Sequence, residues 1–198
     1  MSNNRIQLLI AAEAAKIIAT EGQMHYGTAK RKAANRITGN SKAKNLPSNQ
    51  QIESALREHQ KIFGGTQHQE LQTTFLKAAI DAMTFFDAFQ PCLTGSTLEG
   101  TAEPYSRISL HLFAADTDDV LHLLLAHGIK FKQQQRRIRW QQGNHENKDF
   151  FQIEQTEQAF ELAVFKNKNE RPICPVSGLA QRRANIKEVK TQLKNLLT

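Results

Sequence analysis

Apolar residues in the first part of the chain recur at helical spacing. Between residues 5 and 21 they stand three or four positions apart, which predicts an amphipathic helix with Gly22 as its C-cap. Residues 28–37 predict a second, short helix with Thr28 as its N-cap and basic side chains on its surface. Two helices joined by a short turn, the second one basic, would suit contact with a phosphate backbone.

A third helix is predicted from residue 48 onward. Residues 38–47 are polar and form a loop, after which Ser48 and Gln51 match a capping box. Gly64 and Gly65 then interrupt the helical pattern. The sequence therefore predicts a basic helical region at residues 1–64 and a second domain at residues 66–198.

The second region opens with another helical stretch. Thr66 and Gln69 match a second capping box, and the apolar stripe that follows predicts a long helix through Phe89. Pro91 ends this helix, because proline cannot continue the hydrogen-bond ladder. Phenylalanines at this spacing are typical of a core, so we interpret the stripe as core packing.

Alternation of apolar and polar residues then predicts strands. These are residues 92–94, 106–113, 129–131, 138–140, 150–154 and 159–165. The segments 129–131 and 138–140 read as the two arms of a hairpin with one apolar and one basic face. Strands interspersed with helices are consistent with an α/β or α+β class.

Two further helices are predicted by their caps. Asp116 and the acidic residues after it suit the N-cap and first turn of a helix that Gly128 closes. Asn185 with Glu188 matches a capping box at the start of a last helix.

The net charge of +7 is unevenly distributed along the 198 residues. Residues 1–64 hold ten Lys and Arg against four Asp and Glu, whereas residues 65–198 hold sixteen against fifteen. An excess of cations favours a polyanionic partner such as nucleic acid, although a solvated basic surface has the same composition. The candidate nucleic-acid-binding residues are Lys30, Arg31, Lys32 and Arg36.

Other classes of protein are disfavoured by composition. No run of 18 apolar residues occurs, so no membrane partner is expected, and the N-terminus lacks the pattern of a signal peptide. Cys92 and Cys174 provide neither metal-ligand spacing nor a disulfide framework. These features predict a cytoplasmic protein; its oligomeric state does not follow from the sequence.

One stretch, Gly95–Leu110 with the sequence GSTLEGTAEPYSRISL, suggests chemistry. Glycine lets the backbone approach an anion closely, and exposed N–H groups beside a serine hydroxyl can hold a phosphate. A glycine-led turn that runs into a strand is therefore a candidate phosphate-binding site.

This stretch resembles the motif of nucleotidyltransferases of the DNA polymerase β superfamily. That family carries Gly-Ser, a spacer with a second Gly, and then Ser-Asp-hydrophobic-Asp-hydrophobic. The positions that match without a gap are Gly95, Ser96, Gly100, Ala102, Ser106, Ile108 and Leu110. Arg107 and Ser109 stand where the family has its two metal-binding carboxylates. The whole chain also resembles bacterial proteins classed as nucleotidyltransferases, in the stretches AKRKAANR, LPSNQQIESALREHQKIF and PVSGLAQRRA.

The resemblance implies an α+β fold with a mixed sheet flanked by helices, preceded by a three-helix N-terminal region. It places a third carboxylate on a later strand, at Glu161, which would be catalytic in an active enzyme. It also implies that nucleotide contacts come from Gly95, Ser96, Ser106, Arg107 and Ser109. An arginine cannot serve as a metal ligand, so we predict that Glu161 instead forms an ion pair with Arg107.

Three functions remain open on the sequence. The first is a catalytically degenerate nucleotidyltransferase-like protein that binds nucleotide or nucleic acid and needs no cofactor. The second is an active nucleotidyltransferase that holds Mg²⁺ through Glu161 with ligands such as Ser109, His111 or Asp116. The third is a non-catalytic protein-interaction module.

Overall fold

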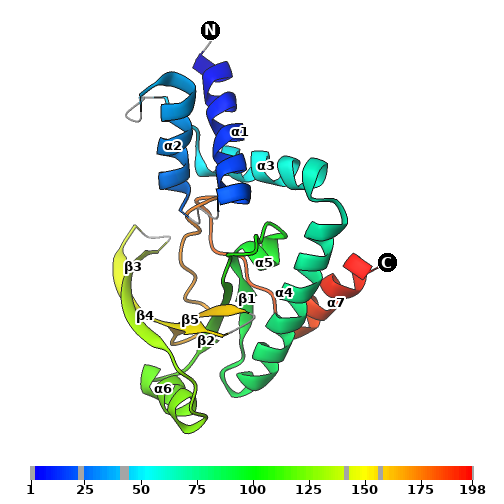
Figure 1. Cartoon of the computed structure of the whole chain (residues 1–198). Helices are drawn as coiled ribbons and strands as arrows, with labels where there is room; N and C mark the ends of the chain where they lie inside the picture. The colour runs from blue at the N-terminus through cyan, green and yellow to red at the C-terminus, as the bar shows by residue number, and fades with distance from the viewer. Residues whose placement is uncertain (1–2, 22–24, 41–44, 141–142, 156–157, 198) are drawn as a thin grey trace. The chain divides into compact units, whose positions relative to one another are not determined.

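The computed structural model describes residues 3–21, 25–40, 45–140, 143–155 and 158–197 (Figure 1). The chain divides into two compact units. The helical unit comprises residues 1–71, 103–105 and 175–177, and the sheet unit comprises residues 72–102, 106–174 and 178–198.

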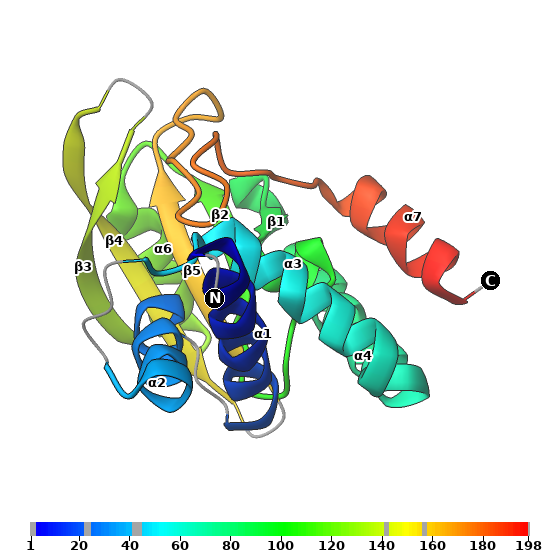
Figure 2. The same cartoon turned by 90° about the horizontal axis from the view of Figure 1, so that it is seen from above.

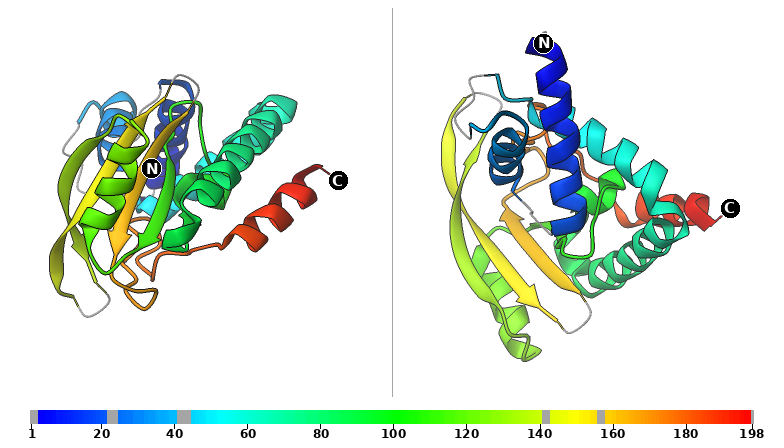
Figure 3. Two further views of the ribbon diagram at one scale, coloured as in Figure 1. Left: turned by 90° about the horizontal axis from the view of Figure 1, so that it is seen from below. Right: turned by 45° about the horizontal axis from the view of Figure 1, so that its top comes forward.

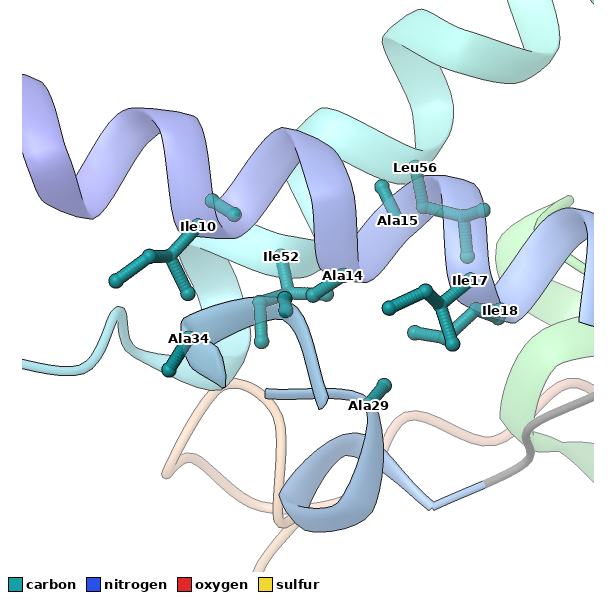
Figure 4. Packing of buried hydrophobic residues seen from close by; sticks show 11 residues of the cluster. Ile10, Ala14, Ala15, Ile17, Ile18, Ala29, Ala34, Ile52 and Leu56 are labelled. Atoms are coloured by element: carbon teal, nitrogen blue, oxygen red, sulfur yellow. The ribbon is translucent and has the colours of Figure 1, made fainter. Parts of the chain in front are cut away.

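Three helices form the core of the helical unit. They are α1 (Asn3–Glu21), α2 (Tyr26–Thr38) and α3 (Asn49–His59). Isoleucines of α1 and α3 pack against alanines of α2, so the small side chains let the helices approach closely (Figure 4). The three helices predicted in this region are confirmed.

The ends of these helices differ in part from the prediction. Ser48 and Gln51 form the predicted capping box at the start of α3. Thr28 as N-cap of α2 is wrong, because His25 occupies that position and accepts from the Thr28 backbone N–H at 3.0 Å. The helix starts earlier since Tyr26 packs against the helical core. The predicted C-cap Gly22 lies outside the described residues.

The long helix also begins differently from the prediction. A π-helical turn, η1 (Gln60–Gly64), leads directly into α4 (Gly65–Phe85), so Thr66 lies in the first turn of α4 and not at its cap. Gly65 has φ of 48° and ψ of −139°, which breaks the helical geometry at the junction. A 3₁₀ turn, η2 (Asp87–Phe89), follows α4 before the first strand.

In the described part of the chain, five strands form one mixed sheet in the order β1-β2-β5-β4-β3. They are β1 (Cys92–Thr94), β2 (Ile108–Phe113), β3 (Lys132–Arg139), β4 (His145–Glu154) and β5 (Ala159–Phe165). Strands β2 and β5 are parallel, and the other neighbours are antiparallel. Figure 2 shows the strands side by side. The α+β class, with helices flanking a mixed sheet, is confirmed.

The predicted hairpin between residues 129–131 and 138–140 is wrong. Residues 132–139 are one continuous strand, β3, whose partner is β4. The glutamines between the two predicted arms do not turn, because Gln133 and Gln135 both donate to the Asp149 carboxylate of β4 at 3.3 Å.

Besides the part of α4 from Gln72 onward, three further helices of the described chain accompany the sheet. They are α5 (Gly95–Glu99), α6 (Thr117–Ala126) and α7 (Ile186–Leu197). Asp116 caps α6 as predicted, accepting from the Asp118 N–H at 3.1 Å, and Asn185 and Glu188 form the predicted capping box of α7. Helix α6 lies against β5, with Val120 and Leu124 buried (Figure 3, left).

The two faces of the sheet differ in character. One face carries the apolar residues of the core, among them Leu110, Leu112 and Leu162, which are all fully buried. The alternate residues point to the other side, which we call the polar face. Two rows of neighbours cross it, Thr94–Ser109–Glu161–Gln152–Lys132 and Cys92–His111–Ala163–Phe150–Gln134.

Candidate functional site

The Gly-Ser motif lies beside the strand that carries Ser109. Strands β1 and β2 pair so that Thr94 stands opposite Ser109, and Gly95 then starts α5. Gly95 has φ of 71°, a conformation that side chains disfavour, and a Cβ there would lie 3.5 Å from the Ser109 Oγ. The fold therefore brings the backbone of Gly95 next to the side chain of Ser109.

Glu161 joins these residues through the parallel pairing of β2 and β5. Its Cα partner on β2 is Ser109, and its partner on β4 is Gln152. Neighbours directly across a sheet point to the same side, so Glu161 lies on the polar face next to Ser109. The carboxylate expected from a later strand thus stands next to the motif.

The Glu161 carboxylate is engaged by a cation from β3. Arg136 donates to the Glu161 Oε2 in an ion pair, and its guanidinium lies 4.7 Å from the centroid of the Phe150 ring. Gln152 Nε2 also donates to Glu161 Oε2, at 3.4 Å. A cation–π contact and a charge-assisted hydrogen bond together hold Arg136 in place. The sequence analysis missed Arg136, because its partner Glu161 lies on β5, which does not pair directly with β3.

The predicted ion pair between Glu161 and Arg107 is wrong. Arg107 instead pairs with Glu154 of β4. Because Ile108 pairs with Phe160, Arg107 falls in the row of Ala159, one row away from Glu161. Ala159 is small and stands next to Glu154 on β4, so the long arginine side chain can extend over it.

The Arg136–Glu161 pair is expected to contribute measurably to stability. Its side chains are 38% and 17% exposed, so R136Q and E161Q should each cost about 1–3 kcal/mol, because each leaves a half-buried charge without its partner. The double variant should cost less than the sum, and chemical denaturation of the four proteins measures the difference. R107Q and E154Q give a comparison cycle at a pair whose carboxylate is 65% exposed, where about 0–1 kcal/mol is expected. Additive costs at Arg136 and Glu161 would contradict the pairing.

The other phosphate-site candidates, Ser96 and Ser106, both precede β2 in the chain. Ser96 is partly buried in α5, and its carbonyl accepts from the Thr101 N–H at 2.9 Å. Ser106 is partly buried. The strand predicted to start at Ser106 begins at Ile108 instead, so Ser106 lies just before β2. Ser109 is the candidate on this stretch that stands directly beside Glu161.

His111 is buried and engaged in a structural contact. Arg183 Nε donates to His111 Nδ1 at 2.8 Å, and the imidazole ring packs on Phe165 with centroids 4.5 Å apart. Burial lowers the pKa of His111 well below its usual range, and the charge of Arg183 lowers it further. His111 is therefore neutral near pH 7, with Nδ1 already used as an acceptor.

These contacts leave little capacity for a metal ion. Asp116 caps α6 at the far end of β2, and its Oδ1 accepts from a backbone N–H. Among the residues the structure describes, no three His, Cys, Asp or Glu side chains gather closely enough to hold a metal. The possible metal donors at this place are the Ser109 hydroxyl and the Glu161 carboxylate, and the carboxylate is paired with the Arg136 guanidinium. This set does not match the oxygen-rich shell that Mg²⁺ requires.

The basic residues of α2 are mostly bound to other side chains. Lys32 pairs with Glu21 at 3.2 Å, and Arg36 pairs with both Glu13 and Glu21. Lys30 donates to Asn49 Oδ1 at 3.1 Å, and burial lowers its pKa. Arg31 is exposed. Two of the four predicted cations, Lys32 and Arg36, thus pair with carboxylates of α1, which reduces the net field of the cluster.

Comparison with known proteins does not assign this site. No family model, no curated protein and no solved structure matches the chain. Within the described residues, no helix combines the length and the apolar character needed to cross a membrane.

Proposed function

We propose that this chain is a catalytically degenerate nucleotidyltransferase-like protein that binds nucleotide or nucleic acid. One observation carries the proposal. The Gly95 turn, Ser109 and Glu161 lie together at one face of the sheet, and Arg136 forms an ion pair with the Glu161 carboxylate.

The chemistry of the site supports binding without catalysis. Two-metal phosphoryl transfer needs carboxylates that converge on the ions. Here Arg107 and Ser109 replace two of them, and Arg136 neutralises Glu161. Arginine and serine remain good partners for a phosphate, so the site retains donors that suit an anion.

Calorimetry with ATP tests the proposal. We expect binding that is weak and unchanged by Mg²⁺ or Mn²⁺, because the residues that would hold the ions are replaced. The same titration in the presence of EDTA is the control. Binding that Mg²⁺ or Mn²⁺ strongly enhances would favour the active enzyme. The absence of any nucleotide or nucleic-acid binding would favour the interaction module.

Restoring the carboxylates should require removal of Arg136 as well. R107D/S109D places two carboxylates on one face of β2, but Glu161 stays paired with Arg136. We expect Mg²⁺ binding only in R107D/S109D/R136Q, measured by calorimetry, with R107N/S109N/R136Q as the uncharged control. Equal Mg²⁺ binding by R107D/S109D and R107D/S109D/R136Q would show that Arg136 does not block the site.

A further inference from the structure

Exposed cations of the sheet unit lie on two segments that meet at one end of the sheet, with Arg137 and Arg139 on the face of β3 opposite to Arg136. Arg137 and Arg139 lie near the end of β3, and Lys166, Lys168 and Arg171 lie in the loop that follows β5. Both β3 and β5 are antiparallel to β4, so their ends lie at the same end of the sheet. Figures 2 and 3 (left) show this loop beside that end. We call these five residues the basic end.

Backbone contacts fix the loop against β3. Ile173 N donates to the Arg139 carbonyl at 2.8 Å, and Pro172 forms a bridge with Trp140. Arg171 is the residue just before Pro172, so it lies next to the end of β3. The loop is thereby held in the sheet unit, and its cations have defined places.

Arg183 anchors the other side of the same loop. Its guanidinium donates to the carbonyls of Lys168 and Glu170 and lies 4.9 Å from the Phe113 ring centroid. Lys168 Nζ lies 5.9 Å from the same ring. Burial, with a smaller contribution from the Arg171 cation, lowers the pKa of Arg183 to about 10. Several positive charges therefore act on one small region.

The nearby carboxylates neutralise only part of the basic end, where Lys166 acts electrostatically on Glu146. Glu146 and Glu170 both pair with Lys148, which is almost fully buried, at 3.0 and 3.3 Å. Glu146 also accepts from Trp140 Nε1 at 3.1 Å, and Glu170 accepts from the Lys166 backbone N–H at 3.3 Å. Two carboxylates share the single cation of Lys148 and so keep one negative charge, which offsets only part of the five exposed cations.

We infer that the basic end binds the phosphate backbone of nucleic acid. This inference rests on the nucleic-acid branch of the proposed function and names its contact surface. Five exposed cations on two separate segments suit a chain of repeated phosphates better than one small anion. On α2, by contrast, Lys32 and Arg36 are paired with carboxylates. The contact surface is therefore in the sheet unit and not on α2.

Fluorescence anisotropy with short labelled oligonucleotides tests this assignment. Single-stranded and duplex DNA and RNA are titrated with the full chain at several salt concentrations. The test variant is R137Q/R139Q/K166Q/K168Q/R171Q. The α2 variant is K30Q/R31Q/K32Q/R36Q, and K187Q/K190Q on α7 is a control for general loss of charge.

The wild type should bind, with affinity that falls steeply as salt rises, because each neutralised phosphate releases counterions. The test variant should bind at least about tenfold more weakly at low salt, and its log–log salt slope should fall by about one for each contact removed. The α2 variant and the α7 control should stay close to the wild type. Circular dichroism checks folding, and the single variants R139E and K168E, each expected to weaken binding, repeat the test with less perturbation.

The possible failures are distinguishable. If the α2 variant loses binding and the test variant keeps it, the protein binds nucleic acid through α2, and the assignment to the basic end is wrong. If the α7 control weakens as much as the test variant, general charge explains the effect and the inference fails. If polyglutamate displaces the oligonucleotide at equal charge concentration, an acidic protein surface is the better partner. If the wild type binds none of the oligonucleotides, the nucleic-acid branch of the proposed function fails with the inference.

Discussion

Replacing Arg183 by alanine is expected to destabilise the protein by about 3–5 kcal/mol. Its guanidinium donates to His111 Nδ1 at 2.8 Å and to the carbonyls of Lys168 and Glu170 at 2.9 and 2.6 Å. It also stacks 5.0 Å from the centroid of the Phe165 ring. Removing it leaves the buried His111 Nδ1 and two loop carbonyls without this donor and removes one of the contacts that hold the loop after β5 on the sheet.

Urea unfolding followed by tryptophan fluorescence measures this change. Trp140 is the one tryptophan of the chain and lies edge-on to Phe165, 6.2 Å between centroids, so it reports on the sheet unit. R182A is the matched control, because Arg182 is 63% exposed and pairs with Glu99 at 3.6 Å, worth about 0–1 kcal/mol. A cost for R183A no larger than that of R182A would show that the buried contacts do not hold the loop.

Mild acid is expected to destabilise the protein through His111. Its folded-state pKa lies well below the usual 6.5, because the ring is buried and Arg183 lies against it. As pH falls below about 6.5, the unfolded chain binds a proton at this histidine and the folded chain does not, so stability falls. The loss continues down to the folded-state pKa, with a slope of up to about 1.4 kcal/mol per pH unit.

The variant H111N isolates this contribution. Asparagine keeps an acceptor in the position of Nδ1 for Arg183 but does not titrate. Unfolding free energies measured between about pH 7 and pH 5 should therefore fall less steeply for H111N than for the wild type. The buried neighbour Cys92 stays neutral in this range, since burial raises the pKa of its thiol. Parallel pH profiles would show that His111 is not the responsible group.

The same contacts bear on function. Arg183 and the loop it holds position Lys168 and Arg171, which belong to the basic end. R183A should therefore weaken oligonucleotide binding as well as stability, whereas E161Q should change stability with little effect on that binding. The two sites of the sheet unit can thus be separated experimentally.

Local signals in the sequence were sufficient for the longer helices and several of their ends, but not for the short α5 or for the end of α4 at Phe85. The capping boxes at Ser48 with Gln51 and at Asn185 with Glu188 join residues three apart, so the pattern contains the whole interaction. Strands β2 and β5 could be predicted equally well from their alternation of apolar residues, because the two-residue period of a strand is a local property. Glu161 was expected on a strand after the Gly95 motif, and the register of β2 and β5 places it opposite Ser109.

Only the tertiary structure decided which charges meet. Arg136 and Glu161 are 25 residues apart, Arg107 and Glu154 are 47 apart, and Arg183 and His111 are 72 apart. Their pairing depends on strand order and register, and a shift of one row moves Arg107 from Glu161 to Ala159. The sequence by itself determined the longer helices, the alternation in β2 and β5, and the net charge. Strand order, ion pairs and the location of uncompensated cations follow from long-range packing, which no local pattern encodes.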